Sequence, residues 1–193
     1  ATEEYFNVTA TRRGSERTTS FPFASSGNGR HLITMHWCGW TVVNTHAESG
    51  SRDVERDARE SQLLHMSRLH ELEDGQVFVL AGDFNLRAGE EAPLEREGWR
   101  DAWSTMPAAS EDWTWCKVPF SARYDRIFLH DASASGSRVE CTHMQRLDAL
   151  WPSLSDHVAL HAVLRRWPSH GAPGGCPLLL AVGGPVVLPT ATG

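Results

Sequence analysis

The alternation of apolar and polar residues predicts a strand hairpin, a helix and a further strand in the first half of the chain. Residues 30–37 ("RHLITMHW") and 40–46 ("WTVVNTH") alternate and are rich in β-branched side chains, so we expect two strands joined at Cys38–Gly39. Residues 52–73 are rich in helix formers, with apolar positions at helical spacings. These positions are Leu63, Met66, Leu69 and Leu72. The apolar run "VFVLAG" then predicts a buried strand at 77–82, and the strand–helix–strand order indicates a helix that covers one face of a sheet.

Three more strands and a tail are predicted in the second half. The strands are "RYDRIFLH" (123–130), "SRVECTHMQRL" (137–147) and "HVALHAVLRR" (157–166). Residues 88–120 are rich in loop signals, with one helical turn in "EEAPLEREGW". After Trp167 the composition changes to a Gly- and Pro-rich stretch without a period. We therefore expect one domain over residues 1–167 and a disordered tail over residues 168–193.

The charge balance and the cysteines narrow the functional class. The 193 residues carry 18 Lys and Arg against 24 Asp and Glu, a formal net charge of −6, which argues against a protein that coats nucleic acid through bulk positive charge. Local contact with the end of a nucleic-acid strand is compatible with this charge. The 4 cysteines form no CxxC pair, so we expect reduced thiols in an intracellular compartment, without a disulfide framework or a zinc knuckle. We expect neither a signal peptide nor a membrane span, because the longest apolar stretch is short and is broken by Gly and Pro.

Polar side chains that a core does not need stand at the ends of four predicted strands. They are His46 in "NTHAES", Asp83 and Asn85 in "GDFNLR", Asp125 in "YDRI", and Asp156 and His157 in "LSDHVAL". A single residue of this kind is more often structural, since a Gly-Asp pair favours turns and a strand-end histidine is usually hydrogen-bonded. Together they supply oxygen ligands suited to Mg²⁺, imidazoles for proton transfer or charge stabilisation, and an amide that can fix a water or a phosphate. This combination indicates metal-assisted hydrolysis.

The same motifs resemble those of a known superfamily. In their order and separations, "THAES", "GDFN", "YDRI" and "SDH" are similar to the motifs of the endonuclease/exonuclease/phosphatase superfamily, which has the deoxyribonuclease I-like fold. Within it, the chain resembles most closely the tyrosyl-DNA phosphodiesterase 2 family, through "EEYFNVTATRRGSERTTSFPF", "VNTHAES", "GDFNLR", "DWTWCKVP" and "ARYDRIFLH". The resemblance covers about residues 3–166. It implies an α/β (α+β) fold, a four-layer sandwich of two sheets with outer helices.

The resemblance also implies a role for the polar strand-end residues. His157 would contact the scissile phosphate as a base-like or charge-stabilising imidazole, and Asp125 would orient it by accepting its other ring proton. Asp83 would position the attacking water or act as general base, and Asn85 would hold a phosphate oxygen. His46 would donate to the phosphate and stabilise charge that develops in the transition state.

Further residues are implied to bind the metal and the substrate. Asp156 would lie in the ligand shell of Mg²⁺, for which Mn²⁺ could substitute. Ser49 and Arg87 would touch phosphates, and Trp115 would offer a stacking face to a base at a strand end. Two of these residues have a second interpretation, because Arg87 could be a solvated loop residue and Trp115 a core side chain. The partner would be DNA whose 5′ end carries a tyrosyl adduct, bound by a monomer in the nucleus or the cytoplasm.

Two upstream elements of the family pattern are not found in the sequence. They are an asparagine at the end of the first strand and a "QE" glutamate that is the principal Mg²⁺ ligand. Glu3 and Glu4 align after the ligand strand and do not replace it. We therefore expect a fold whose first strands are missing, and weak or no activity of the 193-residue chain by itself. Upstream sequence that supplied both residues would make the protein an ordinary active enzyme.

Three functions are open on this reasoning. The first is a Mg²⁺-dependent 5′-tyrosyl-DNA phosphodiesterase that acts in the repair of topoisomerase adducts. The second is another member of the superfamily: an apurinic endonuclease, a deadenylase, or a phosphoinositide or sphingolipid phosphodiesterase. The third is an inactive remnant that only binds nucleic acid or a partner. The intact "GDFN", "YDRI" and "SDH" groups count against this third function.

Overall fold

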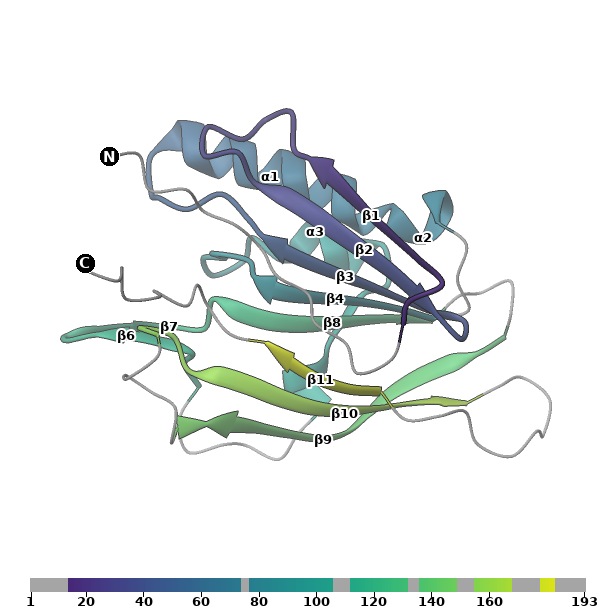
Figure 1. Cartoon of the computed structure of the whole chain (residues 1–193). Coiled ribbons are helices and arrows are strands. Elements are labelled where there is room, and N and C mark those ends of the chain that lie inside the picture. Colours follow the sequence, from purple (N-terminus) through teal and green to yellow (C-terminus); the bar gives the residue numbers. More distant parts are fainter. Residues whose placement is uncertain are drawn as a thin grey trace, which may run out of the picture.

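The computed structural model describes residues 14–73, 77–105, 112–131, 136–148, 155–167 and 178–182. These residues form three layers, with helices above a six-stranded sheet and a three-stranded sheet below it (Figure 1). The sandwich of two sheets with outer helices that the motifs implied is confirmed. Among the described residues, the helices cover the six-stranded sheet and none lies on the outer face of the three-stranded sheet (Figure 1).

The larger sheet has the strand order β1-β2-β3-β4-β8-β5. Its strands are β1 (Arg17–Pro22), β2 (His31–Trp37), β3 (Trp40–His46), β4 (Val77–Asp83), β8 (Asp125–Asp131) and β5 (Arg100–Asp101). The predicted β2–β3 hairpin is confirmed, and it turns through Cys38 and Gly39 with φ of 47° and 78°, which suits a two-residue turn. Strands β3 and β4 are parallel and are joined by α1 (Asp53–Ser67), which confirms the strand–helix–strand unit. Strand β8 pairs with β4 in the antiparallel direction.

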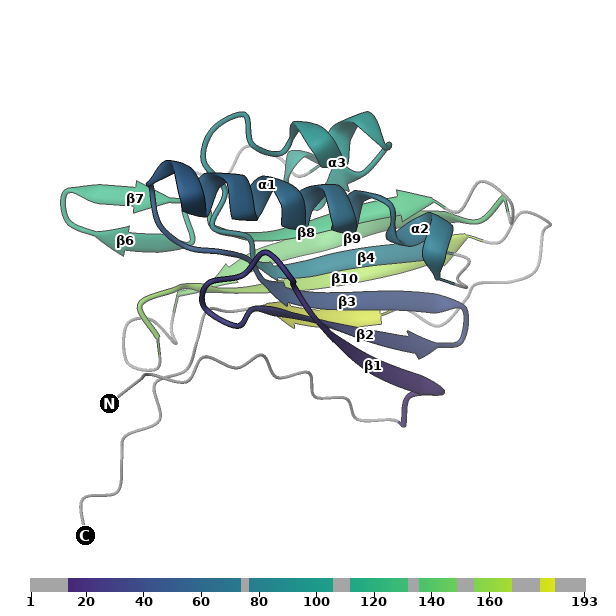
Figure 2. The same ribbon diagram turned by 90° about the horizontal axis from the view of Figure 1, so that it is seen from above.

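Three helices, α1, α2 (Leu69–Leu72) and α3 (Ala92–Arg96), lie on one face of this sheet (Figure 2). The helix predicted over 52–73 is confirmed, with a break at Arg68, where φ and ψ are −99° and 5°. The buried cluster between helices and sheet includes Leu32, Val43, Leu63, Met66, Leu69, Phe78, Leu80, Phe84, Leu94, Trp99 and Phe128. Leu72, the last of the predicted apolar positions, is exposed instead. In the described segments, no helix has both the length and the apolar character needed to cross a membrane.

The smaller sheet has the order β11-β10-β9 and packs against the other face of the larger sheet (Figure 1). Its strands are β9 (Arg138–Leu147), β10 (Ala159–Trp167) and β11 (Leu178–Val182). The inward side chains of β9 and β10, such as Met144, Leu160 and Leu164, meet Val79 and Ile127 of the larger sheet in a second buried cluster. This cluster holds the two sheets face to face.

Strand β11 corrects the expectation of a disordered tail for residues 178–182, which belong to the smaller sheet. Residues 178–182 pair with β10 in the antiparallel direction, with Leu178 opposite Leu164. Leu178 and Leu180 pack against the cluster between the sheets. The Gly- and Pro-rich composition of the whole segment predicted disorder, but a short apolar run within it pairs with the edge of β10. Residues 168–177 and 183–193 lie outside the described part of the chain, as do residues 1–13 with the "EEYF" motif.

A short hairpin leaves the larger sheet next to β8, where the sequence predicted only loops (Figure 1). It consists of β6 (Trp115–Lys117) and β7 (Phe120–Ala122). Its strands are too short for an alternating pattern to be visible in the sequence. At its tip Val118 and Phe120 are 88% and 69% exposed, and at its base Trp115 forms a backbone bridge with His157.

Candidate active site

Three of the predicted residues lie in one row across the larger sheet. His46 ends β3, Asp83 ends β4 and Asp125 begins β8, and in the strand register His46 is opposite Asp83 and Asp83 is opposite Asp125. Because β3 and β4 are parallel and β8 is antiparallel to β4, these three positions meet at the same edge of the sheet. The sheet hydrogen bonds therefore bring together motifs that lie far apart in the sequence.

His157, two residues before β10, completes this row. Its Nδ1 lies 2.7 Å from Oδ2 of Asp125, which is fully buried. A carboxylate can only accept, so Nδ1 carries the proton, and Nε2 faces Oδ2 of Asp83 at 3.9 Å. Burial alone would lower the pKa of His157, but the hydrogen bond and charge of Asp125 and the charges of Asp83 and Asp156 raise it to about 9. His157 is therefore cationic at neutral pH.

Thr114 holds this pair in place. Its hydroxyl accepts a hydrogen bond from the backbone N–H of Asp125 at 2.9 Å, and its carbonyl accepts one from the N–H of Val158 at 2.6 Å. One residue thus fixes both the strand that carries Asp125 and the strand that follows His157.

Asp83 and Asn85 form a turn at the end of β4. Oδ1 of Asp83 accepts the backbone N–H of Asn85 at 2.9 Å, and Asn85 has a φ of 50°, a left-handed conformation that asparagine tolerates. The amide of Asn85 donates to the carbonyl of Ala47 at 3.2 Å. Burial and the charge of Asp125 raise the pKa of Asp83 to about 7, although the charge of His157 opposes this. Turn chemistry explains the backbone here, and it leaves Oδ2 of Asp83 facing both histidines.

Arg30 is a residue of the site that the sequence reasoning missed. It is buried, and its guanidinium contacts Nδ1 of His46 at 2.9 Å and donates to Oγ of Ser49 at 3.3 Å. A guanidinium can only donate, so Nδ1 of His46 accepts and Nε2 carries the proton, 3.3 Å from Oδ2 of Asp83. Burial, the charge of Arg30 and the charge of His157 together lower the pKa of His46 to about 3. The positive charge on this side of the site is therefore on Arg30 and not on His46.

The position of Arg30 in the sequence carried a signal that could have revealed it. It directly precedes β2, whose register places Leu32 opposite Thr45. An arginine at the start of a predicted apolar strand, at the end of the hairpin where His46 lies, is a candidate for the site. Ser26 fixes its backbone, because the Ser26 hydroxyl accepts the Arg30 N–H at 2.8 Å and donates to the buried carboxylate of Glu48 at 2.7 Å.

The low pKa of His46 predicts a specific dependence of stability on pH. With a pKa of about 3 in the folded state against 6.5 when unfolded, His46 favours folding above pH 6.5 and loses this contribution as the pH falls towards 3. When the pH falls from 7 to 5, we expect protonation of this residue in the unfolded state to lower the free energy of unfolding by about 2 kcal/mol. His46→Gln should make the pH dependence shallower by that amount in urea unfolding at the two pH values. His65→Gln, on the exposed side of α1, is the matched control, and an equal slope in wild type and His46→Gln would contradict the assignment.

The other side of the site is aromatic. Trp115 is half-buried, and its Nε1 donates to Oδ2 of the exposed Asp156 at 3.1 Å. Its ring lies 5.5 Å from that of Tyr124, which lies 6.3 Å from the imidazole of His157. Arg87 places its guanidinium 4.7 Å from the centre of the Tyr124 ring and donates to the carbonyl of Asn85 at 2.8 Å. Trp115 thus lies at the rim of the site, and the guanidinium of Arg87 lies over the ring of Tyr124.

The oxygen donors at this edge fit part of a Mg²⁺ site. Asp83, Asn85 and Asp156 supply the carboxylate and amide oxygens that this ion prefers, and Mg²⁺ is often bound by one or two carboxylates while waters and substrate phosphates complete its shell. Within the described segments, no three acidic, His or Cys side chains at this edge bring ligand atoms within 4.8 Å of one another. The described residues can therefore supply some of the ligands of the ion and not a complete cage.

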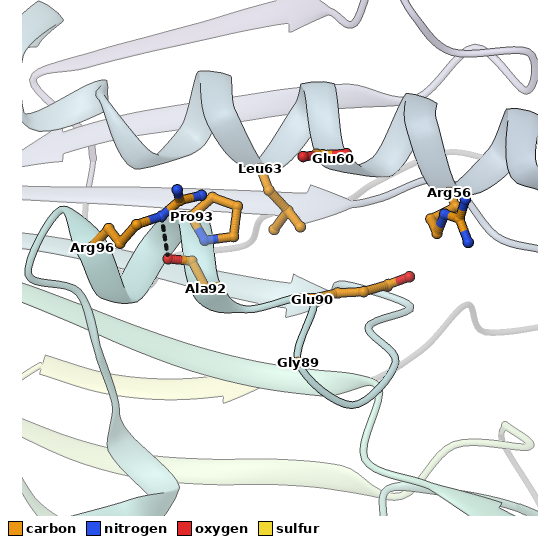
Figure 3. A pocket seen from close by; sticks show the side chains of 8 residues that line it. All are labelled: Arg56, Glu60, Leu63, Gly89, Glu90, Ala92, Pro93 and Arg96. Carbon is orange, nitrogen blue, oxygen red and sulfur yellow. Dashed lines mark hydrogen bonds between the residues drawn. The ribbon is translucent and has the colours of Figure 1, made fainter.

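A separate hollow of about 230 Å³ lies between α1 and α3 (Figure 3). The residues that line it are Arg56, Glu60, Leu63, Gly89, Glu90, Ala92, Pro93 and Arg96. None of the predicted site residues is among them. Glu90 is also the partner of the buried Arg59, whose guanidinium makes two contacts of 2.8 Å with its carboxylate. The hollow is therefore distinct from the row of polar strand ends.

Comparison with solved structures identifies the fold. TDP2 of D. rerio in complex with a single-strand DNA product has a TM-score of 0.63 and 23% identity, covering 78% of this chain and 67% of that chain. The endonuclease/exonuclease/phosphatase of Bacteroides vulgatus has a TM-score of 0.58 and 19% identity, covering 78% of this chain and 65% of the other. This chain has the endonuclease/exonuclease/phosphatase fold. Truncated TDP2 of Caenorhabditis elegans shares the fold with a TM-score of 0.53 and 22% identity over 76% of this chain and 64% of that one.

The similarity to these solved structures is one of fold, and it extends over only part of their length. No protein-family model matches the sequence, and no curated protein matches it. The chain spans about two thirds of the length of the three structures, with coverage of 67%, 65% and 64%. The endonuclease/exonuclease/phosphatase fold explains why the polar strand ends converge, since its paired sheets place them at one end of the sandwich.

Proposed function

We propose that the chain is a metal-dependent phosphodiester hydrolase that acts on the 5′ end of a DNA strand and cleaves a 5′-phosphotyrosyl bond. The observation that carries the proposal is the row of His46, Asp83 and Asp125, closed by His157 at 2.7 Å from Asp125. Structural residues would not need two carboxylates and two imidazoles side by side. In a phosphate site each would have a task, and His46 would donate its Nε2 proton to a phosphate oxygen.

The cationic side chains near Asp83 would have a different task from Asp83 itself. A phosphate would bind beside the imidazolium of His157. This charge, together with that of the buried Arg30 on the far side of His46, would favour the negative charge that develops on the phosphate oxygens. Asp83 lies between these cations, 3.3 Å from His46 and 3.9 Å from His157. It would orient the attacking water and take its proton, a role for which a pKa of about 7 is well suited.

Because the leaving group is a tyrosine, these residues can cleave the bond without a strong general acid. Tyrosine has a pKa of about 10, so a phenolate leaves far more easily than a sugar alkoxide and needs little acid catalysis. Positioning and electrostatic stabilisation can then supply most of the rate. When bound, Mg²⁺ or Mn²⁺ would supply a Lewis acid that neutralises phosphoryl charge, and Asp156 would lie in its ligand shell.

The rim of the site would bind the DNA strand. The exposed part of the Trp115 ring can stack on a base, and Arg87 and Ser49 can contact phosphates on either side of the row. The D. rerio structure, which holds a single-strand DNA product, supports a strand end as the substrate. The net charge of −6 is compatible with a short strand end, and repair of topoisomerase adducts in the nucleus would present such a substrate.

A comparison of cleavage rates on three substrates tests the proposal. The natural protein, with any residues that precede Ala1, is given a 5′-tyrosyl oligonucleotide, an abasic duplex and an RNA that ends in adenosines, each in MgCl₂ and in EDTA. We expect Mg²⁺-dependent release of tyrosine, at least about a hundredfold faster than cleavage of the other two. No release of tyrosine, or faster cleavage of the abasic duplex, would show that the substrate is wrong.

A further inference from the structure

A second group of metal-ligand residues lies at the opposite end of the sheet from the row of His46, Asp83 and Asp125. His70 in α2 and Glu97 just after α3 lie on the helix-covered side, next to His130 of β8. In the strand register His130 is opposite Phe78, whereas Asp125 is opposite Asp83. These two pairs are five residues apart along the strands, so the two groups are separated by roughly 17 Å.

The group has the composition and spacing of a transition-metal site. His70, Glu71 and Glu97 offer ligand atoms that all lie within 4.8 Å of one another. Around a Zn²⁺ ion, with bonds of about 2.0 to 2.2 Å, tetrahedral ligand atoms lie about 3.4 Å apart. Glu71 is exposed and Glu97 and His70 are half-buried, so a change of side-chain rotamer can close the remaining gap.

A hydrogen bond fixes the tautomer of the His70 imidazole. Its Nδ1 lies 2.9 Å from the carbonyl of Ser67. A carbonyl can only accept, so Nδ1 carries the proton and Nε2 has the lone pair. A hydrogen bond of this kind from the second ring nitrogen fixes the tautomer and direction of most metal-binding histidines. Within the described part of the chain, no hydrogen bond engages Nε2.

The surroundings of His70 are rigid. Its ring stacks on that of His130, with centres 4.2 Å apart and planes at 25°. His130 is 7% exposed, and its Nε2 donates to the carbonyl of Glu97 at 3.0 Å. The same buried imidazole therefore supports the histidine ligand by stacking and the Glu97 backbone by a hydrogen bond. Trp99 packs against both rings, at 6.5 Å from His70 and 5.1 Å from His130.

We propose that His70, Glu71 and Glu97 bind a divalent transition-metal ion, with Zn²⁺ as the preferred ion and water as the remaining ligand. One imidazole with two carboxylates favours Zn²⁺ over Mg²⁺, since Mg²⁺ prefers an all-oxygen shell. The ion would tie α2 to the end of α3 across the face of the sheet. The site is independent of the proposed hydrolysis, because it shares no residue with the strand-end row.

Titration of the metal-free chain with ZnCl₂ and with MgCl₂ in a calorimeter tests the site. We expect one Zn²⁺ equivalent whose affinity falls at least about tenfold in His70→Gln and in Glu71→Gln, and is unchanged in Glu95→Gln. Glu71 is exposed, so its substitution separates loss of a ligand from loss of the fold. Zinc X-ray absorption should report one nitrogen and otherwise oxygen neighbours.

The strand-end row is the competing location for the same ion. Asp83→Asn with Asp156→Asn removes the two carboxylates there, and this double variant should retain the Zn²⁺ equivalent. Full affinity in both His70→Gln and Glu71→Gln, or loss of the Zn²⁺ equivalent in the double variant, would overturn the proposal.

Discussion

Asp125→Asn should lower the turnover number for a 5′-tyrosyl oligonucleotide by about a thousandfold or more, with little change in KM. Asp125 is fully buried, and its only described task is to accept the Nδ1 proton of His157 at 2.7 Å. Asparagine preserves the shape but removes the charge that helps raise the pKa of His157 to about 9. It also allows the other tautomer, because an amide can donate as well as accept. His157 would then face Asp83 and the phosphate in the wrong protonation state.

Two further variants show whether the effect belongs to the pair. His157→Ala should lose as much activity as Asp125→Asn, and the double variant should lose little more, because the two residues act as one unit. Asp131 lies at the other end of β8, in an exposed ion pair with Arg100, so the Asp131→Asn variant should cleave the substrate at the normal rate. Normal turnover of His157→Ala would contradict the mechanism. A chain that only binds DNA would instead show no turnover in the wild type and unchanged affinity in His157→Ala.

Gly82→Ala should lower the free energy of unfolding by about 4 kcal/mol or more, an exceptional cost for one methyl group. Gly82 has a φ of 142°, which only glycine adopts readily, and a Cβ placed there would lie 1.9 Å from the backbone oxygen of Thr45. Thr45 is its register partner in β3, so the methyl group would force apart the two central parallel strands. No flexible side chain is available to move. The loss should appear in urea unfolding monitored by the tryptophan fluorescence.

Gly89→Ala is the matched control for this substitution. Gly89 also has a positive φ, of 84°, but a Cβ there would meet nothing within 4 Å. Its cost should therefore be that of the left-handed backbone alone, about 1 to 2 kcal/mol. Equal stabilities of the two alanine variants would show that the close approach of Thr45 to Gly82 does not set the strand spacing.

The sequence predicts the parts of this molecule whose physics is local. The β2–β3 hairpin shows alternation, α1 shows a helical period, and β4 is a continuous apolar run, and all three elements are confirmed. The convergence of the polar strand ends follows from parallel and antiparallel pairing, once the order of the strands is accepted. The grouping of His46, Asp83 and Asp125 into one site rests on the combination of polar strand ends and on the resemblance of their motifs, and the strand pairing gives its physical reason.

The features that the sequence does not reveal depend on contacts between segments that are far apart in the chain. Arg30 belongs to the site because β2 pairs with β3, and only the predicted hairpin, not a motif around Arg30, places it near His46. Strand β11 exists because β10 offers an edge to it, and the hairpin of Trp115 has strands of three residues, too short to show a period. His70 and Glu97 meet only because α2 and the end of α3 both lie on the helix-covered face of the sheet, next to His130.

The way in which Trp115 is attached to the sheet has a consequence for how such a site can evolve. The polar strand ends are spaced by the hydrogen-bond ladder of three central strands, which loop changes cannot alter. At the base of the β6–β7 hairpin, Thr114 and Trp115 make backbone contacts with Val158 and His157, while Val118 and Phe120 at its tip are exposed. Selection can therefore lengthen, shorten or exchange the hairpin, and with it the choice of substrate, while the reaction chemistry is inherited unchanged.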